Sequence, residues 1–141
     1  MKIVDRKTFL AMPAGTLFAN YKPCVFENLM IKGETWYGVD GENDKHRIYG
    51  DFLNQWIVEA IKADSSEEWG DKLDDSMKNG TSLAMDFDCQ IRDGGFDPDQ
   101  LFAVWEEADV RQLIERLIES IEETRQKERE VNNEGICMGE G

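Results

Sequence analysis

The stretch VRQLIERLIESI at residues 110–121 contributes most to the choice of fold. Its apolar side chains recur every three or four residues, so they form one continuous stripe along an α-helix. Asp109 and Gln112 give this helix a start that resembles a capping box. Past Thr124 the stripe gives way to charged residues. The chain is therefore predicted to end in an amphipathic helix that has one apolar face to bury.

Upstream of this helix, the stretch at residues 83–92 alternates between apolar and polar side chains from Met85 onward. The alternation places Met85, Phe87, Cys89 and Ile91 on one side and Asp86, Asp88, Gln90 and Arg92 on the other. This period of two predicts a strand with one buried face and one acidic, solvent-exposed face. The turn signal at residues 93–95 and the apolar run at 101–105 predict a returning antiparallel strand.

The N-terminal half is predicted to be mostly strands. Asp5 is placed to cap a short helical turn over residues 6–11. Aromatic and branched residues predict strands at 16–21, 25–31, 35–39 and 46–49, of which the last two form a hairpin around a polar tip at 40–45. Spacing at a period of 3.6 favours a helix over residues 52–63, although the same stretch also fits an extension of the preceding strand. Ser65 or Ser66 is predicted to cap a polar helix that runs to about residue 78, with Gly80 as its C-cap.

Together these elements predict an α+β fold, with an antiparallel sheet of about five or six strands and the C-terminal amphipathic helix packed on one face. The 141 residues suit one hydrophobic core, so we expect a single domain over residues 1–130 and a flexible C-terminal tail over 131–141. No dinucleotide fingerprint or Walker loop is present.

The charge of the chain is strongly acidic and unevenly distributed. Acidic residues outnumber basic ones by 30 to 16, giving a formal net charge of -14, and residues 40–110 hold 19 acidic against 6 basic side chains. Such a surface argues against direct nucleic-acid binding, because basic side chains are needed to neutralise the phosphates. No apolar run is long enough for a membrane span, and no signal-peptide pattern follows Met1, so we expect no membrane association and a cytoplasmic location.

The leading functional hypothesis follows from the position of this charge. Two acidic clusters are candidates for partner binding through Glu67, Glu68, Asp71, Asp74, Asp75, Asp86, Asp88 and Asp93. An acidic surface speeds association with a basic site and fixes its orientation. The sequence thus predicts a non-enzymatic inhibitor or binding protein that acts on the basic surface of another protein, as a nucleic-acid mimic would. Solubility alone is the alternative interpretation of the same charge, and a homo-oligomer remains open.

No catalytic motif supports an enzyme. His46 is the single histidine, no serine lies in a nucleophile elbow, and the three cysteines lack the close spacing of a zinc site. We therefore expect no cofactor and no metal.

Two alternatives remain open. The basic and aromatic residues of the N-terminal half are candidates for sequestering a small nucleotide-like anion: Arg6, Lys22, Lys32, Trp36 and Arg47. The Asp86 to Asp99 cluster is the candidate centre of a metal-dependent hydrolase, through Asp86, Asp88, Asp93 and Asp97. Its spacing departs from that of an EF-hand, and no histidine accompanies it.

A resemblance rests on FLAMPAGTLF at residues 9–18, followed by Tyr21 and Pro23. This run resembles a pattern found in small uncharacterised proteins encoded by phages and prophages. The resemblance covers about fifteen residues and transfers no catalytic residue. It implies a small accessory protein that binds and blocks a host component inside a bacterial cell, with anti-defence activity as one form of such blocking.

Overall fold

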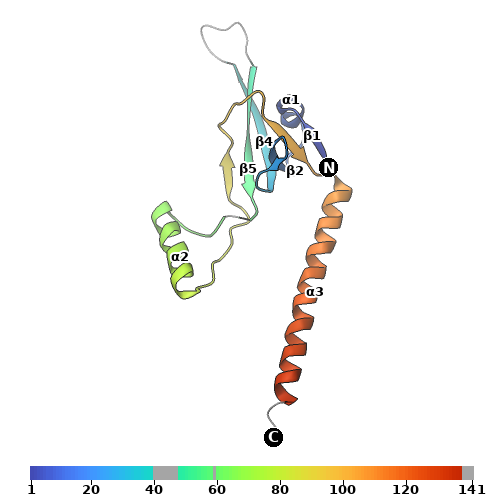
Figure 1. Ribbon diagram of the computed structural model, residues 1–141. Coiled ribbons are helices and arrows are strands. Elements are labelled where there is room, and N and C mark those ends of the chain that lie inside the picture. Colours follow the sequence, from blue (N-terminus) through green and yellow to red (C-terminus); the bar gives the residue numbers. More distant parts are fainter. Residues whose placement is uncertain (40–47, 59, 138–141) are drawn as a thin grey trace. The chain divides into compact units, whose positions relative to one another are not determined.

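A computed structural model describes residues 1–39, 48–58 and 60–137 of the chain (Figure 1). The chain divides into two compact units, residues 1–105 and residues 106–141, and each is described by itself. The first unit is built on a sheet, and the second contains one long helix.

The first unit has the following elements: β1 (Lys2–Val4), α1 (Arg6–Leu10), β2 (Leu17–Lys22), β3 (Val25–Phe26), β4 (Met30–Val39), β5 (Ile48–Trp56), α2 (Ser66–Asn79), β6 (Gln90–Arg92) and β7 (Leu101–Val104). The strands pair antiparallel in the order β1-β7-β2-β4-β5-β6, with β3 on β2. The predicted α+β class and antiparallel sheet are confirmed, with seven strands among the described residues instead of five or six. β7 lies between β1 and β2, so the sheet joins the two ends of this unit.

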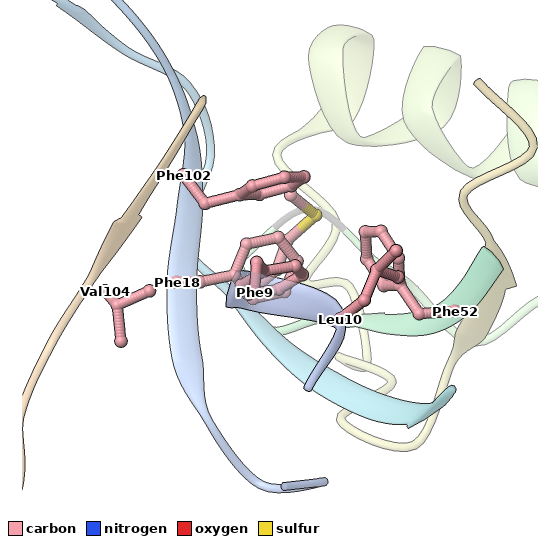
Figure 2. Close-up of a cluster of buried hydrophobic side chains, with 7 residues drawn as sticks. Phe9, Leu10, Phe18, Phe52, Phe102 and Val104 are labelled. Atoms are coloured by element: carbon pink, nitrogen blue, oxygen red, sulfur yellow. The ribbon is translucent and has the colours of Figure 1, made fainter. Parts of the chain in front are cut away.

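The core of the first unit is a cluster of phenylalanines between α1 and the sheet (Figure 2). Phe9 of α1 stacks on Phe102 of β7 at 4.0 Å between ring centroids, and it meets Phe18 and Phe52 at 4.7 and 5.0 Å. All four rings are fully buried. Asp5 caps α1 as predicted, since its side chain accepts a hydrogen bond from the Thr8 amide at 2.8 Å. A five-residue helix therefore brings one aromatic ring into contact with three strands.

The predicted hairpin is confirmed in β4 and β5, whose pairing runs from Met30 with Trp56 to Val39 with Ile48. Its register shifts between Lys32 and Thr35. A Cβ atom at Gly33 in this bulge would lie 2.8 Å from the Cβ of Leu53, so close packing of the two strands requires glycine there. The predicted tip at 40–45, together with His46 and Arg47, lies outside the described residues.

The prediction of a helix at residues 52–63 is wrong. The alternative, in which these residues extend the preceding strand, is confirmed as far as Trp56. β5 pairs with β4 on one side and β6 on the other. Phe52 is fully buried, and its neighbour Leu53, whose side chain points to the opposite face, is half-buried. A central strand therefore carries apolar residues at successive positions, and this pattern imitates helical spacing.

The prediction of a strand at residues 83–92 is wrong for most of this stretch, because only Gln90–Arg92 form a strand, β6. Asp86 accepts a hydrogen bond from the Asp88 amide at 3.0 Å, which forms a turn in place of the extended chain. Phe87, predicted to be buried, is 59 % exposed. β7 is present as predicted, but it pairs with β1 and β2 and does not return along β6.

Two further differences lie near the N-terminus. The strand predicted at 25–31 is split, because β3 ends at Phe26 and Ile31 belongs to β4. β1 was not predicted from the sequence, since three residues show too little periodicity.

The second unit contains α3 (Glu107–Cys137). Asp109 does not precede this helix but lies in its first turn, where its side chain accepts a hydrogen bond from the Glu106 amide at 3.0 Å. The helix continues to Cys137, past residue 131, where the sequence predicted a tail. The apolar stripe is about half exposed at Ile114, Leu117, Ile118 and Ile121. The packing predicted for this helix and the flexibility predicted for residues 131–141 stay predictions.

Candidate functional site

The helix α2 carries five of the predicted acidic residues, and its ends are set by local sequence signals. The Ser65 side chain accepts a hydrogen bond from the Glu68 amide at 3.1 Å, and Gly80 ends the helix in the left-handed conformation with φ of 69°. Glu68 also accepts a hydrogen bond from the Asp64 amide at 2.7 Å. The predicted caps at both ends are confirmed.

None of the residues of α2 is buried. Glu67, Asp71, Asp74 and Asp75 are exposed, and Glu68 is half-buried. Glu68 pairs with Lys72 at 2.6 Å and Asp74 with Lys78 at 2.5 Å, one turn further along the helix. The helix therefore holds five carboxylates against two ammonium groups and displays its acidic residues to solvent.

Two of these carboxyl groups have a lowered pKa. For Glu68, the hydrogen bond from Lys72 is the largest cause of the lowered pKa, and the bond from the Asp64 amide adds to it. For Asp75, hydrogen bonds from Thr81 and then Asn79 lower the pKa. Both groups therefore stay ionised well below neutral pH.

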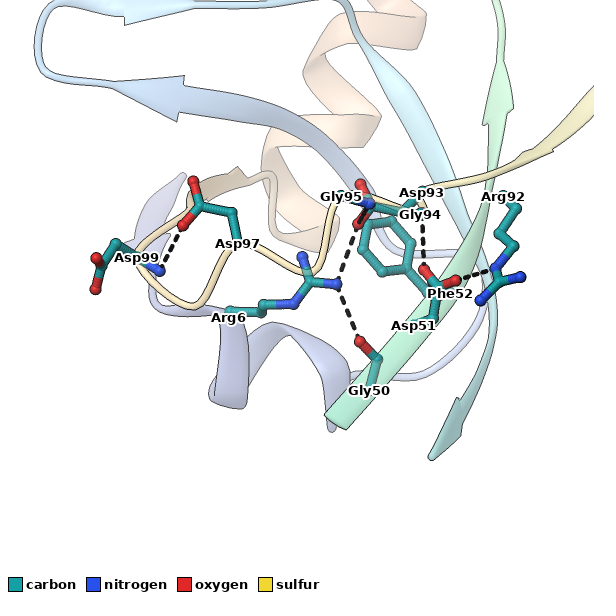
Figure 3. A network of polar contacts seen from close by, with 10 residues as sticks. All are labelled: Arg6, Gly50, Asp51, Phe52, Arg92, Asp93, Gly94, Gly95, Asp97 and Asp99. Carbon is teal, nitrogen blue, oxygen red and sulfur yellow. Dashed lines mark hydrogen bonds and ion pairs between the residues drawn. The ribbon is translucent and has the colours of Figure 1, made fainter. Parts of the chain in front are cut away.

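The remaining predicted acidic residues lie elsewhere. Asp86 and Asp88 form the turn described above, between α2 and β6. Asp93 follows β6 and accepts a hydrogen bond from Arg6 at 3.1 Å, so its charge is matched by a nearly buried guanidinium group. Asp97 accepts a bond from the Asp99 amide at 2.9 Å, in the same loop (Figure 3). The eight candidates thus lie on three separate segments, of which α2 carries the largest group.

A second ion pair lies beside the first and anchors the same loop (Figure 3). Asp51 of β5 is fully buried and accepts hydrogen bonds from the amides of Phe52 at 2.9 Å and Gly94 at 3.0 Å, and from the Arg92 side chain. Burial acts to raise the pKa of Asp51, but the bonds from Arg92, Gly94 and Phe52 outweigh it and lower the pKa. The loop after β6 is therefore held to the sheet by charge.

The basic residues proposed for a nucleotide-like ligand are not assembled into one exposed site. Arg6 and Lys32 are 7 % and 2 % exposed, and Arg6 also donates to the Gly50 carbonyl at 3.0 Å. Lys22 is exposed and pairs with Glu27 at 3.7 Å. Trp36 is partly exposed beside the Arg92 guanidinium, 5.5 Å from its ring centroid. Arg47 lies outside the described residues.

Lys32 is a buried ammonium group that the structure satisfies with neutral acceptors. It donates to Thr35 Oγ1 at 2.5 Å and to the Gly33 carbonyl at 3.2 Å, and it lies over the Phe9 ring. Burial lowers the pKa of Lys32, and the nearby Glu34 opposes that shift. This lysine therefore serves the interior of the first unit rather than its surface.

A pocket of about 370 Å³ lies between the end of β5 and the first turn of α2. Its walls contain two tryptophans, aliphatic side chains, two hydroxyls and a thiol: Trp56, Ala60, Ile61, Ala63, Ser65, Ser66, Trp69, Cys89 and Ile91. The volume falls within the range of small-molecule sites. No sequence pattern indicates this pocket, because its residues come from three segments up to 35 positions apart. The one available signal was Trp69, a large aromatic residue in an otherwise polar helix.

Among residues 1–39, 48–58 and 60–137, no group of three or more histidine, cysteine or acidic side chains is close enough to hold a metal ion. Asp86, Asp88, Asp93 and Asp97 are therefore not gathered into such a group. Within the same residues, no helix has the length and apolar character needed to cross a membrane. Comparison of the chain with protein-family models, curated proteins and solved structures gives no match.

Proposed function

We propose that this chain is a non-enzymatic binding protein that presents the acidic surface of α2 to a basic site on another protein. The observation that carries this proposal is a capped 14-residue helix with five carboxylates and no buried residue. A helix without a fully buried residue contributes little to the core of the first unit, so its exposed residues are available for a partner.

The electrostatics of α2 fit this role. Hydrogen bonds lower the pKa of Glu68 and of Asp75, and the negative charge is carried by a helix whose two ends are capped. Charge of one sign on a fixed surface raises the association rate with a basic partner and selects its orientation. The resemblance of residues 9–18 to phage and prophage proteins supports a host protein as this partner, in the cytoplasm, with inhibition or anti-defence activity as the outcome.

Charge reversal on α2 tests the proposal, with a matched variant on α3 as control. The test variant carries lysine at Glu67, Glu68, Asp71, Asp74 and Asp75, and the control carries lysine at Glu115, Glu119, Glu122, Glu123 and Glu130. Both change the net charge of -14 by the same amount. The probe is a lysine nonapeptide, titrated by calorimetry at several salt concentrations.

We expect the α2 variant to lose binding and its salt dependence, while the α3 variant keeps most of both. Equal losses in the two folded variants would mean that only net charge matters, and they would contradict the proposal.

The second part of the proposal is that the chain forms a homo-oligomer through α3. The aliphatic residues of α3 at positions 114, 117, 118 and 121 are about half exposed, which is unusual for four neighbouring aliphatic side chains on one helix. We expect sedimentation equilibrium to give a mass above 16.2 kDa that falls to this value when Leu117 is replaced by glutamate. A wild-type chain that sediments at 16.2 kDa at every concentration would contradict this part.

A further inference from the structure

We infer that the pocket between β5 and α2 receives an arginine side chain of the partner. This inference rests on the proposed function, because it names the group that the acidic surface recognises. The pocket combines an apolar, aromatic interior with an acidic surrounding, and a guanidinium group on an aliphatic stem matches both.

The interior supplies contacts for the stem and for the face of the guanidinium group. Trp56 and Trp69 are the two largest side chains of the lining, and Ile61, Ile91 and the alanines complete an apolar wall. A guanidinium plane stacks on tryptophan more favourably than a strongly hydrated ammonium group does. Trp69 is 40 % exposed, so its ring is accessible from solvent.

The charge around the pocket favours a cation. Glu67 and Glu68 lie in the helical turn that also supplies the lining residues Ser66 and Trp69, and Asp64 and Asp88 are the chain neighbours of lining residues. Asp71 lies in the next turn of α2.

Four groups oppose a cation, and the first is Arg92, which follows the lining residue Ile91. Lys72 pairs with Glu68 and donates to the carbonyl oxygen of Lys62, so both lysines lie near this end of α2. The N-terminus of α2 adds a partial positive charge of about +0.5. These groups leave a net negative charge against the five carboxylates.

Two nonapeptides of equal charge, one of arginine and one of lysine, test the inference on the full chain. Tryptophan fluorescence and calorimetry measure both dissociation constants for the wild type and for Trp69→Ala. The control is Met77→Ala, which removes an 82 % exposed apolar side chain of the same helix that does not line the pocket. Trp69→Phe keeps an aromatic face as the conservative variant.

We expect the wild type to bind the arginine peptide roughly two- to fivefold more tightly than the lysine peptide. Trp69→Ala should abolish this preference and change lysine-peptide binding little. Trp69→Phe should keep part of the preference, and Met77→Ala all of it.

Equal affinity for the two peptides in the wild type, or a preference that survives Trp69→Ala, would overturn the inference. If the two peptides bind equally well and charge reversal of α2 abolishes the binding of both, the inference about the pocket fails but the proposed function stands. If charge reversal of α2 leaves both affinities unchanged, the proposed function itself is contradicted.

Discussion

Replacing Asp51 with alanine should lower the free energy of unfolding by about 2–4 kcal/mol, because two backbone amides lose the carboxylate that accepts their hydrogen bonds. The Asp51 side chain is fully buried and accepts three hydrogen bonds, two of them from the amides of Phe52 and Gly94. Leaving the buried Phe52 amide without its acceptor costs roughly 1–3 kcal/mol, and the lost hydrogen bond at the exposed Gly94 adds about 1 kcal/mol. Arg92 adds less, because its side chain is 56 % exposed and water replaces its lost partner.

Urea unfolding followed by tryptophan fluorescence measures this loss, with Asp51→Asn as the milder variant. Asparagine keeps one acceptor oxygen, so we expect it to lose about half as much as alanine. The control is Asp99→Ala, which removes an exposed carboxylate from the same loop and should change stability by less than about 0.5 kcal/mol. A loss below about 1 kcal/mol for Asp51→Ala would refute the view that charge anchors the loop after β6 to the sheet.

The pH dependence of the same variant gives a second readout. The pKa of Asp51 is lower in the folded chain than its ordinary value, so its stabilising contribution is fully present above about pH 4. This contribution is lost as the pH falls through the folded pKa. The difference in stability between wild type and Asp51→Asn should therefore shrink as the pH is lowered below about 4. A difference that stays constant down to pH 2 would contradict the lowered pKa.

Three further predictions concern the rest of the first unit. Phe9→Ala should cost about 3–5 kcal/mol in urea unfolding, because it empties the centre of the phenylalanine cluster; a loss under 1.5 kcal/mol would mean that the cluster closes around the gap. Lys32→Met should remove the pH dependence that its lowered pKa gives the wild type, whose stability rises as the pH approaches 10; an unchanged slope between pH 8 and 10 would contradict this. Ser65→Ala should cost about 1 kcal/mol and lower the helical circular dichroism signal of α2; no change in either would show that Glu68 alone holds this helix start.

Local signals in the sequence predicted α2 and its caps, because Ser65 and Gly80 act on the backbone within a few residues. The same holds for Asp5 at the start of α1. Prediction failed where distant segments decide the structure. Residues 52–56 became a strand because β4 and β6 pair on both sides of it.

In the candidate site, too, the features set by local sequence were predicted and those that depend on distant segments were not. The acidic residues of α2 were predicted, since they follow one another on one helix. The pair of Arg6 with Asp93 joins residues 87 positions apart, and no local pattern indicated that it removes both charges from a binding surface. The pocket also depends on segments brought together by the sheet, so neither Trp56 nor Cys89 was identified as part of it.

The position of β7 between β1 and β2 also affects the order of events during synthesis of the chain. Until β7 (Leu101–Val104) has been synthesised, one edge of β2 has no strand to pair with, and β1 has no pairing strand on either edge. The roughly 80 residues between β2 and β7 take about 4–16 seconds to translate at 5–20 residues per second. During that interval an aromatic strand edge is open to pairing with other chains. The chain is therefore expected to depend on rapid late closure, or on a chaperone, to avoid aggregation at the ribosome.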